Sequence, residues 1–204
     1  FQASGLARRV HDSPTLKESF DKLVSKDESR ATSKRTLDRR VATRWDSDKK
    51  CLSAHLHFHT EVEQLTGVSS HRLQAYRLNE AQWAIATDLV DALAIFEKAT
   101  HLFSQAEVPL VIDVLPLLFN IRLSLIAMRD DSDPNLSAVI RVAAQAAIMM
   151  IHKYTVFTEE CEIYYIAIVM CPDRKLDWFK ARGYTAAQIK NIRTMVVKRW
   201  TEAY

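Results

Sequence analysis

Residues 79–105 read NEAQWAIATDLVDALAIFEKATHLFSQ, and this stretch decides the fold class. Its apolar side chains recur every three or four residues, which places them on one stripe of a helix. No glycine or proline interrupts the pattern. We therefore expect a long helix whose apolar stripe contributes to a core. The stripe comprises Ile85, Leu89, Leu93, Phe96, Ala99 and Phe103.

The composition of the whole chain also favours helices. Its 204 residues include only three glycines and five prolines, whereas a sheet protein needs turn residues about every ten positions. The apolar content of 48% and charged content of 26% are ordinary for a globular protein with a substantial core. The sequence predicts an all-α fold, a multi-helix bundle.

Helices are predicted on the N-terminal side of this stretch as well. Ser13 and Pro14 form a typical helix start, with proline at the first helical position. Asp46 or Ser47 can cap a second helix that runs to Gly67, a residue typical of helix ends. We group residues 1–40 as N-terminal helices with a basic connection and residues 41–204 as a helical domain, although the two can form one continuous domain.

Four further helical segments are predicted on the C-terminal side. Residues 109–128 are apolar nearly all round, so this helix should be central, with Pro116 kinking or dividing it. The Asp-rich residues 130–134 should end that helix and begin the next, with Pro134 in its first turn. Helices are then expected at 136–157 and 160–170, and Thr185 with Gln188 forms a capping box for the last helix.

The net charge of +3 conceals an uneven distribution. Residues 1–50 carry 13 Lys or Arg against 8 Asp or Glu, residues 51–170 carry 7 against 14, and residues 171–204 carry 8 against 3. Two basic ends around an acidic middle would allow one face to bind a polyanion. A solvated helical surface without a partner accounts for the same numbers equally well.

The cysteines and the hydropathy of the sequence indicate the cellular compartment and whether the chain spans a membrane. Its three cysteines are odd in number and have no C-x-x-C spacing, which indicates a reducing, intracellular compartment. No uncharged apolar run reaches the roughly 18–20 residues of a membrane span. We expect no membrane association. A targeting segment before Phe1 would not be visible in this sequence.

Two groups of residues have the chemistry of metal ligands. Cys51, His55 and His59 are spaced to share one face of a helix, but no second segment supplies partners for them. Asp130, Asp131 and Asp133 could bind a divalent ion, but an Asp-rich turn between helices usually caps those helices. We expect no metal, no cofactor and no catalytic residue, because no nucleophile motif or glycine-rich phosphate loop is present.

Residues 42–47, Ala-Thr-Arg-Trp-Asp-Ser, suggest nucleic-acid binding. Arginine binds phosphate through two parallel hydrogen bonds, and the indole of tryptophan stacks on bases. The candidate DNA-binding residues are Arg44 and Trp45, together with the preceding basic residues Lys34, Arg35, Arg39 and Arg40. The alternative is that Trp45 fills the helix bundle and Arg44 pairs with a carboxylate.

Four ordered segments resemble the helical insertion domain of hAT-family DNA transposases. Residues 43–47 are similar to that family's TRWNS-type motif. Residues 93–104, followed by Pro109 and residues 114–116, resemble its F-x-x-A-T-x-x-L-S helix and V-L-P element. Lys153-Tyr154 and residues 167–179 resemble its K-Y pair and its A-x-x-L-D-P-R-x-K-L-x-x-F segment. The departures are Asp46 for asparagine, Leu110 for threonine and Cys171 for aspartate.

This resemblance implies a function for the chain. The family's catalytic carboxylates would lie outside residues 1–204, so the chain would be a non-catalytic domain that contacts DNA near a transposon end through Arg44 and Trp45, and its location would be nuclear. The alternative is a domesticated module that binds proteins, or a second copy of itself, without binding DNA. Salt-dependent DNA binding distinguishes the two.

Overall fold

The computed structural model describes residues 2–26, 36–104, 110–159 and 161–203. Within these ranges the chain is all-helical, with ten α-helices, three short 3-10 helices and no strand. The predicted fold class is confirmed. The chain divides into two compact units, Phe1–Glu97 with Asp131–Arg141 and Lys98–Asp130 with Val142–Tyr204. The grouping of residues 1–40 as a separate segment stays a prediction.

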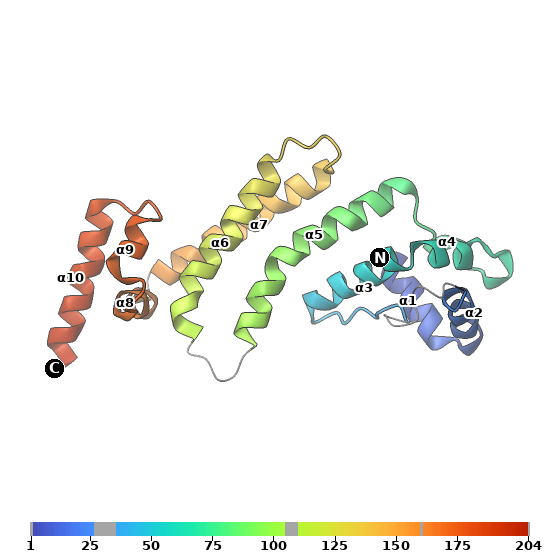
Figure 1. The fold of residues 1–204 in the computed structure, drawn as a ribbon, viewed down its shortest axis with the longest axis horizontal. Coiled ribbons are helices and arrows are strands. Elements are labelled where there is room, and N and C mark those ends of the chain that lie inside the picture. The colour runs from blue at the N-terminus through green and yellow to red at the C-terminus, as the bar shows by residue number, and fades with distance from the viewer. Residues whose placement is uncertain (1, 27–35, 105–109, 160, 204) are drawn as a thin grey trace. The chain divides into compact units, whose positions relative to one another are not determined.

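The first unit contains four helices and most of a fifth, and all five are labelled in Figure 1. These are α1 (Gln2–Asp12), α2 (Pro14–Val24), α3 (Trp45–His57), α4 (His59–Gly67) and α5 (Glu80–Phe103). The ring of Phe20 on α2 meets Phe58 edge to face, with 5.2 Å between the ring centroids. Gly5 lets α1 pack closely against the ring of Tyr76, because a Cβ atom at this position would lie only 2.5 Å from that ring. Leu6, Leu65 and Leu73 complete the fully buried centre.

Side-chain caps begin two of these helices. The Oγ of Ser13 accepts a hydrogen bond from the backbone of Leu16 (3.4 Å), as predicted for the start of α2. At α5, the side-chain oxygen of Asn79 accepts from the Gln82 backbone (2.9 Å), and the Gln82 side chain accepts from the Asn79 backbone (3.0 Å). This reciprocal capping box satisfies donors that a helix start leaves unpaired.

The single helix predicted from Asp46 or Ser47 to Gly67 is wrong in two respects. Its N-cap is Arg44, so Asp46 and Ser47 lie within the helix, and the helix is interrupted at Phe58. That residue has φ −102° and ψ 31°, which ends α3 and begins α4. Its amide still donates to Ala54 (3.0 Å) and its carbonyl accepts from Val62 (2.8 Å). The deviation lets the Phe58 ring enter the core, where it is fully buried. Tertiary packing therefore outweighs helical periodicity here.

The long helix predicted around residues 79–105 is confirmed as α5, within the described residues. Its burial differs from the expectation. Only Trp83 and Ala86 are buried, and Phe103 is 43% exposed. The rest of the stripe, from Ile85 to Ala99, is half-buried. The division between the two units falls after Glu97, so neither core covers the whole stripe.

The second unit is built on an aromatic cluster. Its elements are the 3-10 helix η4 (Leu110–Asp113), α6 (Val114–Asp130), most of α7 (Ala138–Glu159), α8 (Glu162–Met170), α9 (Lys175–Lys180) and α10 (Ala186–Ala203). Phe179 is fully buried at the centre. The ring centroids of Tyr165, Trp178 and Tyr184 lie 5.8, 5.1 and 5.2 Å from its own. Leu115 from α6 and Ile192 from α10 pack into the same cluster.

Arg174 fixes the start of α6 to the turn between α8 and α9. Its guanidinium donates to the carbonyl of Ile112 and to the carboxylate of Asp113, both at 2.6 Å. Arg174 and Asp113 are 27% and 24% exposed, so the pair is partly shielded from water. A planar fork that binds two acceptors at once fixes both distance and orientation. The adjacent Lys175 has φ 50°, which is rare for a residue with a side chain.

The expectations for residues 109–128 need correction. Pro109 lies outside the described residues. Pro116 neither divides nor interrupts the helix, because it is the third residue of α6. The first four amides of a helix have no intrahelical acceptor, so a proline there removes no bond. The helix is also less central than expected, since only Leu115, Ile121 and Leu125 are buried and Leu123 is 49% exposed.

One described helical stretch, Val111–Asp130, is long and apolar enough to cross a membrane by length and composition. Its most apolar window has a mean hydropathy of 1.9, and 22% of that window is buried. The core helix of a soluble protein satisfies the same criteria. The predicted absence of membrane association stays a prediction.

The turn before α7 also differs from the prediction. α7 begins at Ala138, so Pro134 precedes the helix and does not lie in its first turn. The carboxylates of the turn bind its own backbone: Asp131 accepts from the amide of Asp133 (2.9 Å), and Asp133 accepts from that of Asn135 (2.8 Å). Arg141 donates to the carbonyls of Asp131 and Asp133. These bonds stabilise the turn itself and do not cap α7. At the start of that helix it is the hydroxyl of Ser137 that accepts a hydrogen bond, from the amide of Val139 (3.3 Å).

The C-terminal helices agree with the sequence. α7 and α8 cover most of the segments predicted at 136–157 and 160–170. The capping box before α10 is confirmed, because the Thr185 amide donates to the Gln188 side chain (2.8 Å) and the Gln188 amide donates to the Thr185 hydroxyl (3.2 Å).

Replacing Arg174 by alanine should lower the free energy of unfolding by about 1.5–3 kcal/mol, the usual contribution of hydrogen bonds to a charged group. The substitution leaves the carboxylate of Asp113 and the carbonyl of Ile112 without their donor. Lys180→Ala is the matched control, because its ion pair with Asp177 is exposed and such pairs contribute less than about 1 kcal/mol. Urea denaturation measures both, and equal small losses would contradict this role of Arg174.

The buried imidazole of His55 should make the protein less stable in mild acid. Burial lowers the pKa of His55, against the opposing effect of its hydrogen bond with the Cys51 carbonyl. At pH values above the ordinary histidine value of about 6.5, both the folded and the unfolded chain hold it neutral. As the pH falls below that value, the unfolded chain binds a proton that the folded chain does not. Stability is lost until the lower folded pKa is passed.

Urea denaturation at pH 7.5 and 5.5 tests this expectation. His55→Leu removes the titrating group and should reduce the loss of stability between the two pH values. His11→Gln changes an exposed histidine and should leave the loss as it is in the unaltered chain. An undiminished loss in His55→Leu would show that other groups cause the acid sensitivity.

Candidate nucleic-acid interface

The segment before α3 displays the predicted Arg44 at a tight turn. Leu37 anchors the segment in the core of the first unit, with 5% exposure. The amide of Arg44 donates to the carbonyl of Val41 (2.9 Å), which closes the turn. Arg44 then takes the N-cap position of α3 with extended backbone angles, φ −129° and ψ 105°. Its own side chain makes no capping hydrogen bond.

Ser47 holds this turn from inside. Its side chain is buried, and its Oγ accepts a hydrogen bond from the amide of Val41 (2.8 Å). The same hydroxyl lies 2.6 Å from the carbonyl of Arg44 and 2.9 Å from that of Val41, either of which can accept its hydrogen. One small hydroxyl thus ties both ends of the turn to the first turn of α3. The sequence singled out Ser47 only as a helix cap.

The Arg44 side chain is exposed, and no carboxylate of the described residues lies within ion-pair distance of it. Asp46, two residues later, is paired instead with Lys50 at 3.0 Å. The hydrogen bond from Lys50 lowers the pKa of Asp46, and the charge of Arg44 has a smaller effect in the same direction. The guanidinium of Arg44 is therefore available to an external anion.

The other predicted contact residues differ from Arg44. Arg40 forms an ion pair with Asp48 (2.5 Å), and Arg39 lies 3.9 Å from Asp12. Both arginines are exposed, but each has part of its charge compensated. Lys34 and Arg35 lie outside the described residues, and so does the side chain of Trp45, whose backbone begins α3. The stacking role of Trp45 stays a prediction.

The local charge is positive but mixed. Residues 36–50 carry five Lys or Arg against three Asp. Two of these carboxylates, Asp46 and Asp48, lie in the first turn of α3. Their negative charges interact favourably with the positive end of the helix dipole and repel a bound anion. Any phosphate contact should therefore be narrow and centred on Arg44.

Neither candidate metal group has the arrangement of a metal site. The helix is interrupted between His55 and His59, and the Nδ1–H of His55 is bonded to the Cys51 carbonyl (2.9 Å). His59 is exposed, lies 3.5 Å from Glu63 and packs on the ring of Trp83. Among the described residues, no group of three or more His, Cys, Asp or Glu side chains could hold a metal ion.

The part of α7 in the second unit exposes large apolar side chains. Val142, Met149 and Tyr154 are 69%, 65% and 56% exposed, and Met150 is 50% exposed. Met149, Met150 and Tyr154 fall within two adjacent turns, and Val142 lies two turns before Met149. Exposed apolar groups that gather in this way are more typical of an interaction surface than single exposed residues are.

Comparisons with known proteins identify no relative: no family model, no curated protein and no solved structure matches this chain.

Replacing Ser47 by alanine should loosen the turn that displays Arg44. It removes the acceptor of the Val41 amide, so hydrogen exchange at that amide should accelerate and the free energy of unfolding should fall by about 1–3 kcal/mol. Thr43→Ala alters an exposed residue of the same turn and should change neither quantity. Unchanged exchange at Val41 in the Ser47 variant would show that the hydroxyl does not hold the turn.

Proposed function

We propose that the chain is a non-catalytic helical module, of the kind inserted in hAT-family transposases, that contacts the phosphate backbone of DNA through Arg44. Arg39 and Arg40 add a weaker electrostatic contribution, and Trp45 stacks on an unpaired or displaced base. The ordered motif resemblance suggests the family, and the all-helical fold is compatible with it.

The observation that carries this proposal is the exposed guanidinium of Arg44, which forms no ion pair with the described residues. An arginine that served only the fold would be expected to pair with a carboxylate, as Arg40 does with Asp48. Arg44 instead stands at the N-terminus of a 13-residue helix, on a turn that Ser47 fixes from the buried side. The positive end of the helix dipole lies beside this guanidinium, and Asp46 and Asp48 in the same turn offset part of its effect on an anion.

The compensated charges around Arg44 limit what such a contact can achieve. With Arg40 held by Asp48 and Lys50 by Asp46, few phosphates can be neutralised at once. The salt dependence of binding should accordingly be shallow, because its log–log slope reports the number of neutralised phosphates. Affinity for plain duplex should be weak, and stacking by Trp45 would favour substrates with an unpaired base.

A protein-interaction module is the second candidate, and the exposed apolar side chains of α7 favour it. Val142, Met149 and Tyr154 offer a surface that a partner or a second copy of the chain could cover. Apolar burial, which depends little on salt, would then drive association. DNA binding is not required under this alternative.

Single substitutions distinguish the two candidates. Arg44→Gln should reduce the log–log salt slope of DNA binding by roughly one unit, with an unchanged melting temperature. Trp45→Ala should leave that slope unchanged and cost about 1–3 kcal/mol of affinity on substrates with an unpaired base. Arg9→Gln, an exposed arginine of α1 with the same charge change, is the matched control and should bind as the unaltered chain does.

Fluorescence anisotropy with labelled duplex and gapped DNA at several salt concentrations provides the measurement. If Arg44→Gln binds as Arg9→Gln does, Arg44 is not the contact. If the unaltered chain binds DNA independently of salt, or not at all, the interaction module becomes the better account.

A further inference from the structure

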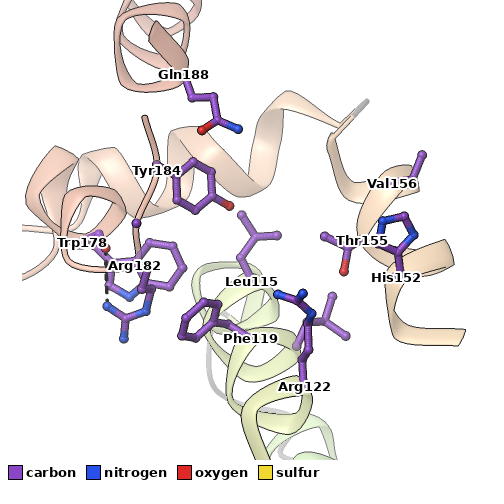
Figure 2. A pocket seen from close by; sticks show the side chains of 12 residues that line it. Leu115, Phe119, Arg122, His152, Thr155, Val156, Trp178, Arg182, Tyr184 and Gln188 are labelled. Carbon is purple, nitrogen blue, oxygen red and sulfur yellow. Dashed lines mark hydrogen bonds between the residues drawn. The ribbon is translucent and has the colours of Figure 1, made fainter. Parts of the chain in front are cut away.

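The second unit contains a pocket of about 340 Å³ that no part of the proposed DNA contact uses. Ligand pockets commonly begin near 300 Å³. The pocket is lined by α6 and α7 and by α9, the turn after it and the start of α10. Figure 2 shows Phe119, Trp178 and Tyr184 on one side of the space, and Arg122 and His152 on the other. Leu115 lies between the two sides.

The basic side of the pocket is suited to an anion. The guanidinium of Arg122 extends from α6 toward the open space (Figure 2), and it takes part in no ion pair or hydrogen bond with the described residues. His152 of α7 lines the same side. Arg182 adds a third basic group, and no carboxylate is among the lining residues. The charged groups that line the space are therefore all basic, a lining that favours an anion.

The aromatic side of the pocket is held rigid. The guanidinium carbon of Arg182 lies 4.1 Å from the centre of the Trp178 ring and 5.5 Å from that of Phe119. Its Nε is buried and has no hydrogen-bond partner among the residues that the structure describes. Such cation–π stacking orients both rings. Tyr184 is fixed in turn by its edge-to-face contact with Phe179. Flat rings held in this way offer a stacking surface for a planar ligand.

Gln188 provides a directional polar group above this surface. Its side-chain oxygen accepts hydrogen bonds from the amide and the hydroxyl of Thr185, at 2.8 and 3.0 Å. The capping box therefore fixes the amide plane and leaves the nitrogen as a donor. Gln188 lines the pocket beside Tyr184 (Figure 2), where that nitrogen can donate to an acceptor on the edge of a heterocycle.

We propose that this pocket binds a nucleoside monophosphate, with its phosphate at Arg122 and His152 and its base against Phe119 and Tyr184. The basic side and the aromatic side of the pocket together favour a ligand that carries both a phosphate and a base. An inorganic anion would leave the aromatic side and the Gln188 donor unused. An uncharged aromatic compound would leave the charge of Arg122 uncompensated. A base joined to a phosphate fulfils both requirements. The ligand can be a free mononucleotide or the 5′-phosphorylated end of a single strand.

Isothermal titration calorimetry on the full chain tests this inference with AMP, adenosine and ribose 5-phosphate. AMP should bind at least about ten-fold more tightly than either fragment, because stacking and charge-assisted hydrogen bonds each contribute that much. Arg122→Gln should weaken AMP binding by about ten-fold or more with an unchanged melting temperature, since Arg122 is exposed. Phe119→Leu should lower the preference for AMP over ribose 5-phosphate.

Two control variants separate this site from general electrostatics and from the proposed DNA contact. Arg193→Gln removes an exposed charge of α10 that does not line the pocket, and Arg44→Gln lies in the other unit. Both should bind AMP as the unaltered chain does. The proposal is overturned if AMP does not bind at millimolar concentration, if adenosine or ribose 5-phosphate binds as tightly as AMP, or if Arg193→Gln weakens AMP binding as much as Arg122→Gln does.

The source of the nucleotide is settled by competition. A single-stranded oligonucleotide with a 5′-phosphate that displaces AMP, while the same strand without the phosphate does not, identifies a strand end as the ligand. If neither strand displaces AMP, the ligand is the free mononucleotide. Both results support the pocket, and neither depends on whether Arg44 contacts DNA.

Discussion

The double hydrogen bond of Arg174 is the constraint on which the second unit depends. The aromatic cluster around Phe179 includes Leu115 of α6, so it is better packed when the start of that helix is held in place. Arg174 provides this by joining η4 to the turn between α8 and α9. Phe119 and Arg122 follow Leu115 at intervals of one helical turn, so the same anchor positions both sides of the nucleotide pocket. Arg174 lies within residues 167–179, one of the segments that resemble hAT proteins, and its contacts give it a structural role in this fold.

Local features of the fold could be read from the sequence, and features set by tertiary packing could not. The Ser13 cap, the Thr185 capping box and the length of α5 depend on neighbouring residues, so their patterns were sufficient. The interruption at Phe58 was invisible, because it arises from an aromatic ring that packs in the core. The burial of α5 was overestimated for a related reason: periodicity identifies an apolar stripe but not how far one core extends along it.

The candidate sites show the same limit. Arg44 is exposed on a turn that the hydroxyl of Ser47 holds through hydrogen bonds with the backbone of Val41 and Arg44. These partners are six and three residues from Ser47, but no recognised sequence motif marks such a turn. The ion pair of Arg40 with Asp48 removes part of the charge that a count of basic residues suggested. The pocket joins residues from 115 to 188, a span across which spacing carries no information. Two of its residues stand out in the sequence, Arg122 as one of the few polar residues in the apolar segment 109–128 and Gln188 as part of the capping box.

The two reciprocal capping boxes have a consequence for how the protein ages. In both boxes the groups that accept the backbone hydrogen bonds are side-chain oxygens, those of Asn79 and Gln82 before α5 and those of Thr185 and Gln188 before α10. Spontaneous deamidation that yields an ordinary aspartate or glutamate keeps an oxygen at each such position. It also adds a negative charge at a helix N-terminus, where the helix dipole favours it. Chemical damage that weakens many amide contacts would therefore leave both helix starts intact.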